Sequence, residues 1–193
     1  RSRTFRSSST TFGIEARDPS RTGRQMLPER VLGLPVVLRH FHAEDASRVR
    51  QLAGDRSVAE TTAVIPHPYL DGMAEEWIAK HESERAGGTQ YAFAVERAED
   101  GLLVGAIALR PVATEHENVG YWIGCGCWGH GYATAATRAI VALAFSCLDC
   151  QRITAAYLAR NPASGRVMEK CGLALVRRET RDHIVRHNLP MVA

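Results

Sequence analysis

Two glycines flank a histidine immediately before a long apolar run, in the stretch CWGHGYATAATRAIVALAF at residues 127–145. A Gly-x-Gly turn that opens a helix exposes backbone N–H groups at the positive end of the helix dipole, where phosphate groups bind. Gly129 and Gly131 let the backbone approach an anion closely. Glycines before a helix also occur as simple turn residues, so the motif alone leaves both interpretations open. It is neither a Walker loop nor a dinucleotide fingerprint, because no Gly-Lys-Ser/Thr and no third glycine follow it.

A second polar feature is the stretch NPAS at residues 161–164. Asn161 precedes Pro162, and this pair is typical of an N-cap followed by the first residue of a helix. Ser164 then occupies the third helical position, where a serine is common without any catalytic duty. The pairs Cys125-x-Cys127 and Cys147-x2-Cys150 have spacings seen in metal sites, but no matching histidine pair accompanies them, so we expect no metal.

The elements that must position these residues follow from hydrophobic periodicity and from the turn residues between apolar runs. We expect helices at 43–54, 73–84, 132–145 and 161–172, and strands at 35–41, 91–97, 102–110, 118–124, 152–158 and 173–178. Short links join the three strands between 91 and 124, which is typical of an antiparallel meander. A strand-helix-strand-helix-strand unit follows, so the fold class is mixed α/β.

Length and composition limit the possible domain organisation, cellular location and partners. The 193 residues suit one folded domain, which we place at 34–193, and the cysteines are best explained as reduced thiols in a cytoplasmic protein. Residues 1–33 are Ser- and Arg-rich with a net charge of +4, which predicts a flexible basic extension, with a transit peptide as an alternative. The net charge of 34–193 is −1, and no apolar run is long enough for a membrane span. We therefore expect neither a nucleic-acid nor a membrane partner, and a monomer or homodimer.

Three stretches in this order resemble one family. NVGYWIGCGCWGHGYATAATRAIVALAF, RITAAYLARNPASGRVMEKCGL and the earlier IPHPY…WI are similar to the GCN5-related N-acetyltransferase (GNAT) superfamily, in its RimJ/RimL-like branch of ribosomal-protein-alanine acetyltransferases. The resemblance covers 34 to about 186 and implies a mostly antiparallel sheet with a V-shaped splay, flanked by helices. It also implies acetyl-CoA as cofactor. The implied contact residues are Ile123, Gly124, Cys125, Trp128, Gly129, His130, Gly131, Tyr132, Ala133, Thr134, Asn161 and Ser164.

Within this resemblance, the strand end at 123–125 would offer a backbone N–H to the thioester carbonyl, and the turn at 128–134 would hold the coenzyme A pyrophosphate. Ser164 matches the polar group near the sulfur. Other branches carry a proton-donating Tyr four residues later, where this chain has Met168, so Ser164 becomes the expected catalytic donor. Tyr69 and Trp77 would wall the acceptor pocket, although Trp77 also suits a core position.

The general base is where the sequence departs from the branch. Relatives usually carry Glu at the positions of Asn118 and Ala135. Glu117 and His116 lie beside Asn118 and are the candidate bases, while the same segment also reads as a solvated turn. An acceptor amine of low pKa would need little help from a base.

The expected function is that of an acetyl-CoA-dependent N-acetyltransferase. It would transfer the acetyl group directly, within a ternary complex, to the primary amine of a protein N-terminus or of a small molecule. The alternative is a CoA-binding module with weakened catalysis and a sensor or assembly role, favoured by Asn118 and Ala135.

Overall fold

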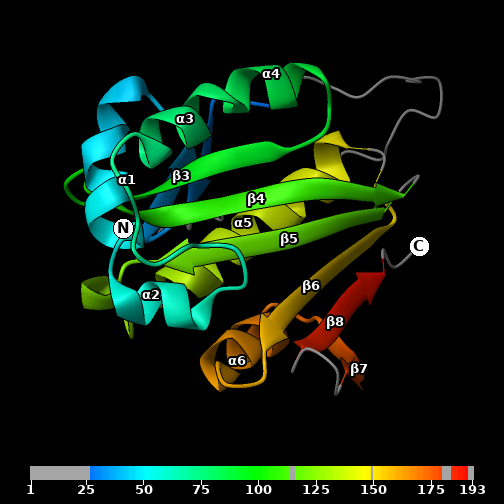
Figure 1. Ribbon diagram of the computed structural model, residues 1–193. Helices are drawn as coiled ribbons and strands as arrows, with labels where there is room; N and C mark the ends of the chain where they lie inside the picture. Colours follow the sequence, from blue (N-terminus) through cyan, green and yellow to red (C-terminus); the bar gives the residue numbers. More distant parts are fainter. Residues whose placement is uncertain (1–26, 114–115, 149, 180–183, 191–193) are drawn as a thin grey trace, which may run out of the picture.

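The computed structural model describes residues 27–113, 116–148, 150–179 and 184–190 (Figure 1). The strands are β1 (Arg30–Gly33), β2 (Val36–Arg39), β3 (Tyr91–Arg97), β4 (Leu103–Ala113), β5 (His116–Ile123), β6 (Arg152–Leu158), β7 (Ala174–Glu179) and β8 (Ile184–Pro190). The helices are α1 (Ala46–Ala53), α2 (Arg56–Thr61), α3 (Met73–Ala79), α4 (His81–Ala86), α5 (Tyr132–Cys147) and α6 (Pro162–Lys170). Two short 3-10 turns, η1 (Ala43–Asp45) and η2 (Cys125–Cys127), complete the order.

The described strands form one sheet in the order β1-β2-β3-β4-β5-β6-β8-β7. Every neighbouring pair is antiparallel except β5 and β6, which are parallel. The expected meander is β3-β4-β5, and β3 begins and ends where the sequence predicts, at Tyr91 and Arg97. The mixed α/β class with a mostly antiparallel sheet is confirmed.

Helices cover both faces of the meander. Helix α5 lies behind the sheet in Figure 1, and its buried residues, such as Ile140 and Ala144, join Phe93 and Ile107 in the larger core. On the other face, α1 and α3 pack a second core around Val49 and Ala94. Because both faces of β3 are covered, its strand sequence is buried nearly throughout and shows no polar alternation.

The sheet opens between β5 and β6. Their pairing runs from His116–Arg152 to Val119–Ala155, yet β5 continues to Ile123 and β6 to Leu158. Beyond Val119 the two strands diverge, and Figure 1 shows β6 running down and away from β5 towards α6. The diverging ends leave backbone groups of β5 without a strand partner on that side. This is the V-shaped splay that the sequence resemblance implies.

Several elements differ from the expectations. The sheet begins at Arg30, so β1 belongs to the folded unit although it falls within the expected flexible extension, of which residues 1–26 lie outside the described part. Helix α2 and strand β8 were not expected, and the helix expected at 73–84 is two helices that meet at Lys80. His81, just after this junction, is 2% exposed and packs against Phe41 and Trp77.

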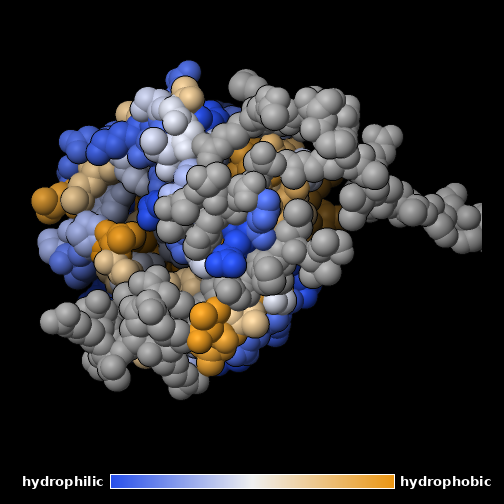
Figure 2. Space-filling view, turned by 90° about the vertical axis from the view of Figure 1, so that its right-hand side faces the viewer, coloured by the Kyte–Doolittle hydropathy of each residue, from blue (hydrophilic) through white to orange (hydrophobic). Residues whose placement is uncertain are grey.

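A buried ion cluster ties the first strands together. The Arg39 guanidinium donates to both carboxylate oxygens of Asp45, at 2.7 and 2.9 Å, and to Glu96 at 2.5 Å. The hydrogen bond to Asp45 is the main cause that raises the pKa of Arg39. On the two outermost described strands, Leu32 of β1 and Val176 of β7 are largely exposed. The end view in Figure 2 shows hydrophobic surface scattered among hydrophilic residues.

Candidate functional site

The turn before α5 has the backbone geometry that an anion site requires. Gly129 and Gly131 have φ values of 82° and 80°, in the left-handed region that favours glycine. Gly131 is the N-cap of α5 and makes no side-chain capping hydrogen bond. The first N–H groups of a helix have no partner within the helix, so here they face outward at the positive end of a 16-residue helix. A Cβ built on either glycine would meet no atom within 4 Å, so the space beside the turn is open.

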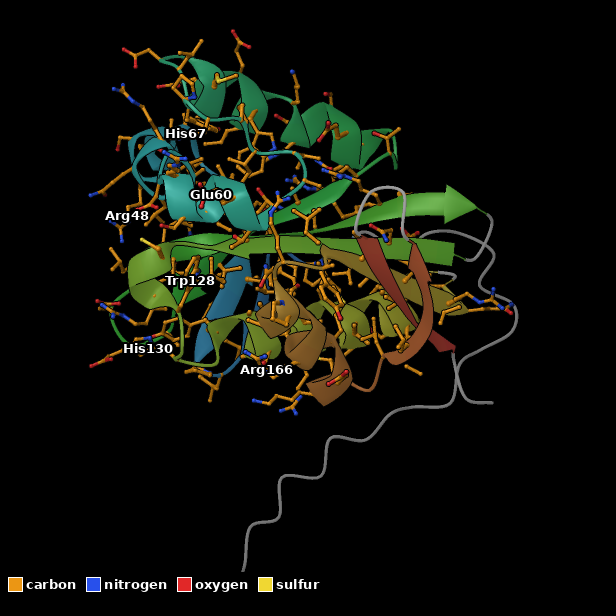
Figure 3. The ribbon with its side chains drawn as sticks, turned by 60° about the horizontal axis from the view of Figure 1, so that its bottom comes forward. Arg48, Glu60, His67, Trp128, His130 and Arg166 are labelled. Carbon is orange, nitrogen blue, oxygen red and sulfur yellow. The ribbon has the colours of Figure 1, made fainter. Side chains whose placement is uncertain are left out.

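The same turn is anchored to the end of β5. The Trp128 indole N–H donates to the Ile123 carbonyl at 2.7 Å, although the Trp128 side chain is nearly half exposed. The His130 Nδ1 atom lies 2.8 Å from the Trp128 carbonyl, and its ring stacks on Tyr132 with centroids 5.5 Å apart. The turn is therefore held in place by its own side chains. His130 is exposed, and Figure 3 shows it pointing away from the sheet.

A cavity of about 850 Å³ fills the splay between β5 and β6. The turn before α5 contributes Trp128, Gly129, Gly131, Tyr132, Ala133 and Thr134; α6 and its N-cap contribute Asn161, Ser164, Arg166 and Lys170; the loop before α3 and α3 itself contribute Val64, Tyr69, Met73 and Trp77. The cavity thus joins both sides of the sheet. Figure 3 shows Glu60 and His67 on the side of α1–α4, and His130 and Arg166 on the opposite side.

Helix α6 places a serine hydroxyl in this cavity. The Asn161 side chain accepts from the Ser164 N–H at 3.3 Å, and Pro162 occupies the first helical position, so the predicted N-cap is confirmed. The Asn161 amide also donates to the Thr61 carbonyl at 3.1 Å, which links α6 to the end of α2. Ser164 is half-buried and lines the cavity.

The Ser164 hydroxyl meets a second hydroxyl that the sequence analysis did not single out. The Tyr121 hydroxyl lies 2.8 Å from the Ser164 Oγ atom. Burial raises the pKa of Tyr121 to about 12, so this phenol keeps its proton at neutral pH. Tyr121 shares one face of β5 with Val119 and Ile123, a pattern that indicates only a core strand. Nothing in the sequence pairs it with a residue 43 positions later.

The strand end expected to hold the thioester carbonyl is partly engaged. The Gly124 N–H donates to the Val104 carbonyl at 2.9 Å, within the sheet. N–H groups alternate sides along a strand, so those of Tyr121 and Ile123 point towards the splay. The Cys125 thiol instead donates to Asp55 at 3.0 Å, and this hydrogen bond is the main cause that raises its pKa. Of the expected group at 123–125, Ile123 lines the cavity, whereas Gly124 and Cys125 are not among its lining residues.

Of the two candidate bases, Glu117 is not brought to the lining of the cavity. Glu117 is 3% exposed, lies on the strand face of Val119 rather than that of Asn118, and is absent from the cavity lining. The backbone of His116 begins β5, and its side chain lies outside the described part. Asn118 does line the cavity, where its amide donates to the Thr154 carbonyl at 3.3 Å and to the Thr154 hydroxyl at 3.2 Å. Asn118 therefore holds β5 to β6 at the apex of the splay.

Tyr69 and Trp77, the two residues predicted for the acceptor pocket, both line the cavity. Trp77 also packs in an edge-to-face contact on Phe41, with ring centroids 5.0 Å apart, so it belongs to the second core and to the cavity wall at once. Burial raises the pKa of the half-buried Tyr69. Across the described residues, no group of His, Cys, Asp and Glu is arranged to hold a metal ion, and no helix there combines the length and hydropathy of a membrane span.

Comparison with known proteins decides the family. The family described as "Acetyltransferase (GNAT) domain" matches residues 36–174. The chain belongs to this family. Over 98 residues it is 32% identical to the probable N-acetyltransferase YjcK of Bacillus subtilis. This match covers 49% of the chain and 54% of the length of YjcK, so the chain spans about half of this relative.

Two solved structures share the fold. RimL, a ribosomal L7/L12 alpha-N-protein acetyltransferase determined with coenzyme A, superposes with a TM-score of 0.76 at 11% identity, over 84% of this chain and 98% of that one. RimJ of Mycobacterium smegmatis superposes with a TM-score of 0.66 at 21% identity, over 83% of this chain and 84% of that one. At these identities the likeness to the two structures concerns the fold alone. The family match over residues 36–174 confirms the expected GNAT resemblance.

Proposed function

We propose that this protein is an acetyl-CoA-dependent N-acetyltransferase that transfers the acetyl group directly to a primary amine. The observation that carries the proposal is the continuity of one cavity, from the glycine turn before α5, through the splay of β5 and β6, to the apolar wall of Tyr69 and Trp77. A cofactor and an acceptor entering from opposite sides of the sheet would meet in the splay. Bringing two reactants together in this way removes much of the entropic barrier.

The residues present fit coenzyme A. The uncapped first turn of α5 and the open space beside Gly129 and Gly131 suit a pyrophosphate, and Arg166 and Lys170 of α6 add positive charge along the same cavity. Acetyl-CoA would supply the activated acetyl group, so that an N–C bond forms as the C–S bond breaks, and on balance one proton passes from the amine nitrogen to the leaving sulfur. The Ile123 N–H would stabilise charge that develops on the acetyl oxygen.

The Tyr121 and Ser164 hydroxyls would deliver the proton that the leaving sulfur takes up. Ser164 can donate from Oγ, and Tyr121, which keeps its proton at neutral pH, can donate to that same oxygen. Among the described cavity residues there is no carboxylate or imidazole to act as a base. The amine would therefore have to reach the splay already neutral, which an α-amine with a pKa near 8 does more readily than a lysine side chain.

The proposal is tested by thiol release from acetyl-CoA with a panel of amines, together with two variants. Ser164→Ala and Tyr121→Phe should each lower kcat, by roughly 10²-fold for a lost proton donor, and the double variant should lose little more than Ser164→Ala alone because the two hydroxyls act in series. Ser83→Ala is the matched control, since Ser83 is exposed on α4 and donates only to the Lys80 carbonyl. Full kcat in Ser164→Ala with an unchanged thermal melt would remove the pair from the mechanism.

Coenzyme A binding without turnover of any amine would instead favour the module with weakened catalysis. Asn118 is the residue that motivates this second candidate, because its amide is committed to Thr154 and cannot accept a proton.

A further inference from the structure

The charged side chains that line the cavity are all positive among the described residues. The described lining contains three cationic side chains, Arg110, Arg166 and Lys170, and no aspartate, glutamate or histidine. Two of the cations belong to α6. The Lys170 carbonyl accepts from Arg138 of α5 at 2.9 Å, so this end of α6 lies beside the helix that carries the glycine turn. Arg166, one helical turn earlier, lies on the same face of α6. These two cations are therefore placed for the cofactor.

Arg110 occupies a different part of the cavity. It lies on β4 directly across from Asn118, at the apex of the splay. Ala106, Ala108 and Arg110 share one face of β4, because side chains two residues apart point to the same side of a strand. That face also carries Asn118 and looks towards α1 and α3, which is the side of Tyr69 and Trp77. The Arg110 guanidinium thus belongs to the acceptor side of the sheet.

A buried amide holds this guanidinium. The Arg110 Nε–H donates to the Gln90 side-chain oxygen, and the Gln90 amide donates to Glu84 at 2.7 Å. Gln90 is 7% exposed, so its orientation is fixed by these two bonds. A guanidinium carries five N–H donors in a planar fork that suits carboxylate and phosphate groups, and Gln90 engages one of them. Gln90 therefore positions Arg110 and does not neutralise its charge.

The rest of the acceptor side is mainly apolar and carries no charge. Its apolar wall is formed by Val64, Ile65, Tyr69, Met73 and Trp77, with the uncharged polar residues Thr61, Thr62 and Asn118 beside it. A polycationic amine would find no carboxylate among the described lining residues and would meet the charge of Arg110. We infer that the acceptor is a primary amine that also carries an anionic group, a carboxylate or a phosphate, on an apolar body, and that Arg110 binds the anion. This inference rests on the proposed acetyltransferase function and assigns its acceptor class.

The test compares amines that differ only in the anion. L-phenylalanine, L-phenylalaninamide and 2-phenylethylamine share one apolar body, O-phosphoethanolamine and ethanolamine form the phosphate pair, and spermidine is the polycation. Values of kcat/KM are corrected for the neutral fraction of each amine. The wild-type enzyme should favour the anionic member of at least one pair by about 10- to 100-fold, the range expected for a hydrogen bond to a charged group. The pair that shows the preference identifies carboxylate or phosphate.

Variants at Arg110 separate recognition from folding. Arg110→Met should abolish the preference by raising the KM of anionic amines, with little change for neutral amines or for the KM of acetyl-CoA, and Arg110→Lys should retain part of it. Gln90→Leu should weaken the preference less than Arg110→Met. Arg56→Met is the control, because Arg56 is exposed on α2, pairs with Glu60 and does not line the cavity.

Two results would count against this reasoning, and they differ. Turnover of neutral amines or spermidine as efficiently as anionic ones, or equal losses for all amines in Arg110→Met, would overturn the acceptor assignment alone. Absence of turnover with every amine of the panel would refute the acetyltransferase function and the acceptor class together.

Discussion

His81 makes the stability of this protein sensitive to mild acid. Its side chain is 2% exposed, and neither ring nitrogen has a hydrogen-bond partner among the described residues. Burial, with a smaller contribution from the Arg85 charge, lowers the pKa of His81 from its ordinary value of 6.5 to about 4. The imidazole is therefore neutral in the core, between the rings of Phe41 and Trp77.

The direction of the change in stability with pH follows from the number of protons that His81 binds in the folded and unfolded states. Between pH 6.5 and 4 the unfolded chain binds a proton at His81 that the folded chain does not, so the free energy of unfolding falls as the pH falls through this window. Each pKa unit corresponds to 1.36 kcal/mol, and the difference between the two pKa values therefore gives a loss of about 3 kcal/mol. Above pH 6.5 His81 contributes no slope, and below about pH 4 it contributes no further loss.

His81→Phe removes the titrating group and keeps an aromatic ring beside Phe41 and Trp77. Urea unfolding between pH 7.5 and 4 should show that the variant loses about 3 kcal/mol less than the wild type over this range. His81→Leu serves as a second apolar variant in case the larger ring strains the site. His67→Gln is the control, because His67 is exposed and its replacement should leave the slope unchanged. An identical slope in wild type and both apolar variants would refute the assignment of the acid sensitivity to His81.

Two further predictions concern the cavity. Gly131→Val should weaken coenzyme A binding at least about 10-fold in calorimetry, because a β-branched residue is strained at φ 80° and its Cβ would occupy the open space beside the turn. Gly126→Val is the control: Gly126 also faces open space but has no positive φ, so this variant should bind coenzyme A normally. The logarithm of kcat/KM should rise with pH up to the pKa of the acceptor amine and should shift when an acceptor of different pKa is used; a constant apparent pKa across acceptors would point to a protein base instead.

The sequence predicted the parts of the fold that local patterns encode. The meander strands, the glycine turn before α5 and the Asn161 cap all depend on residues that are neighbours in the chain. Strand β1 was missed because RVLG is a short run at the end of a polar segment, and it gains its structure from pairing with β2 and from packing on α5. Strand β8 was missed for a similar reason, since its sequence IVRHNLP contains polar residues and proline.

In the candidate site, too, local motifs were predictable from the sequence and contacts between distant residues were not. Ser164 and the turn at 128–134 could be proposed from local motifs, but the contact between Tyr121 and Ser164 depends on how β5 and α6 face each other across the splay. The hydrogen bond from Arg110 to Gln90 depends on the β3–β4 pairing, and neither residue belongs to a motif. The prediction of Glu117 as a base followed its place next to Asn118 in the chain, whereas adjacent residues of a strand face opposite sides of the sheet.

The departure at Asn118 has a structural explanation that bears on the chemistry. At Asn118, the amide donates to a carbonyl and a hydroxyl of Thr154, and a carboxylate there would set its oxygens against the Thr154 carbonyl. Because a glutamate at position 118 would disturb its neighbours, we propose that the acceptor amine reaches the splay already neutral, which favours an acceptor of low pKa.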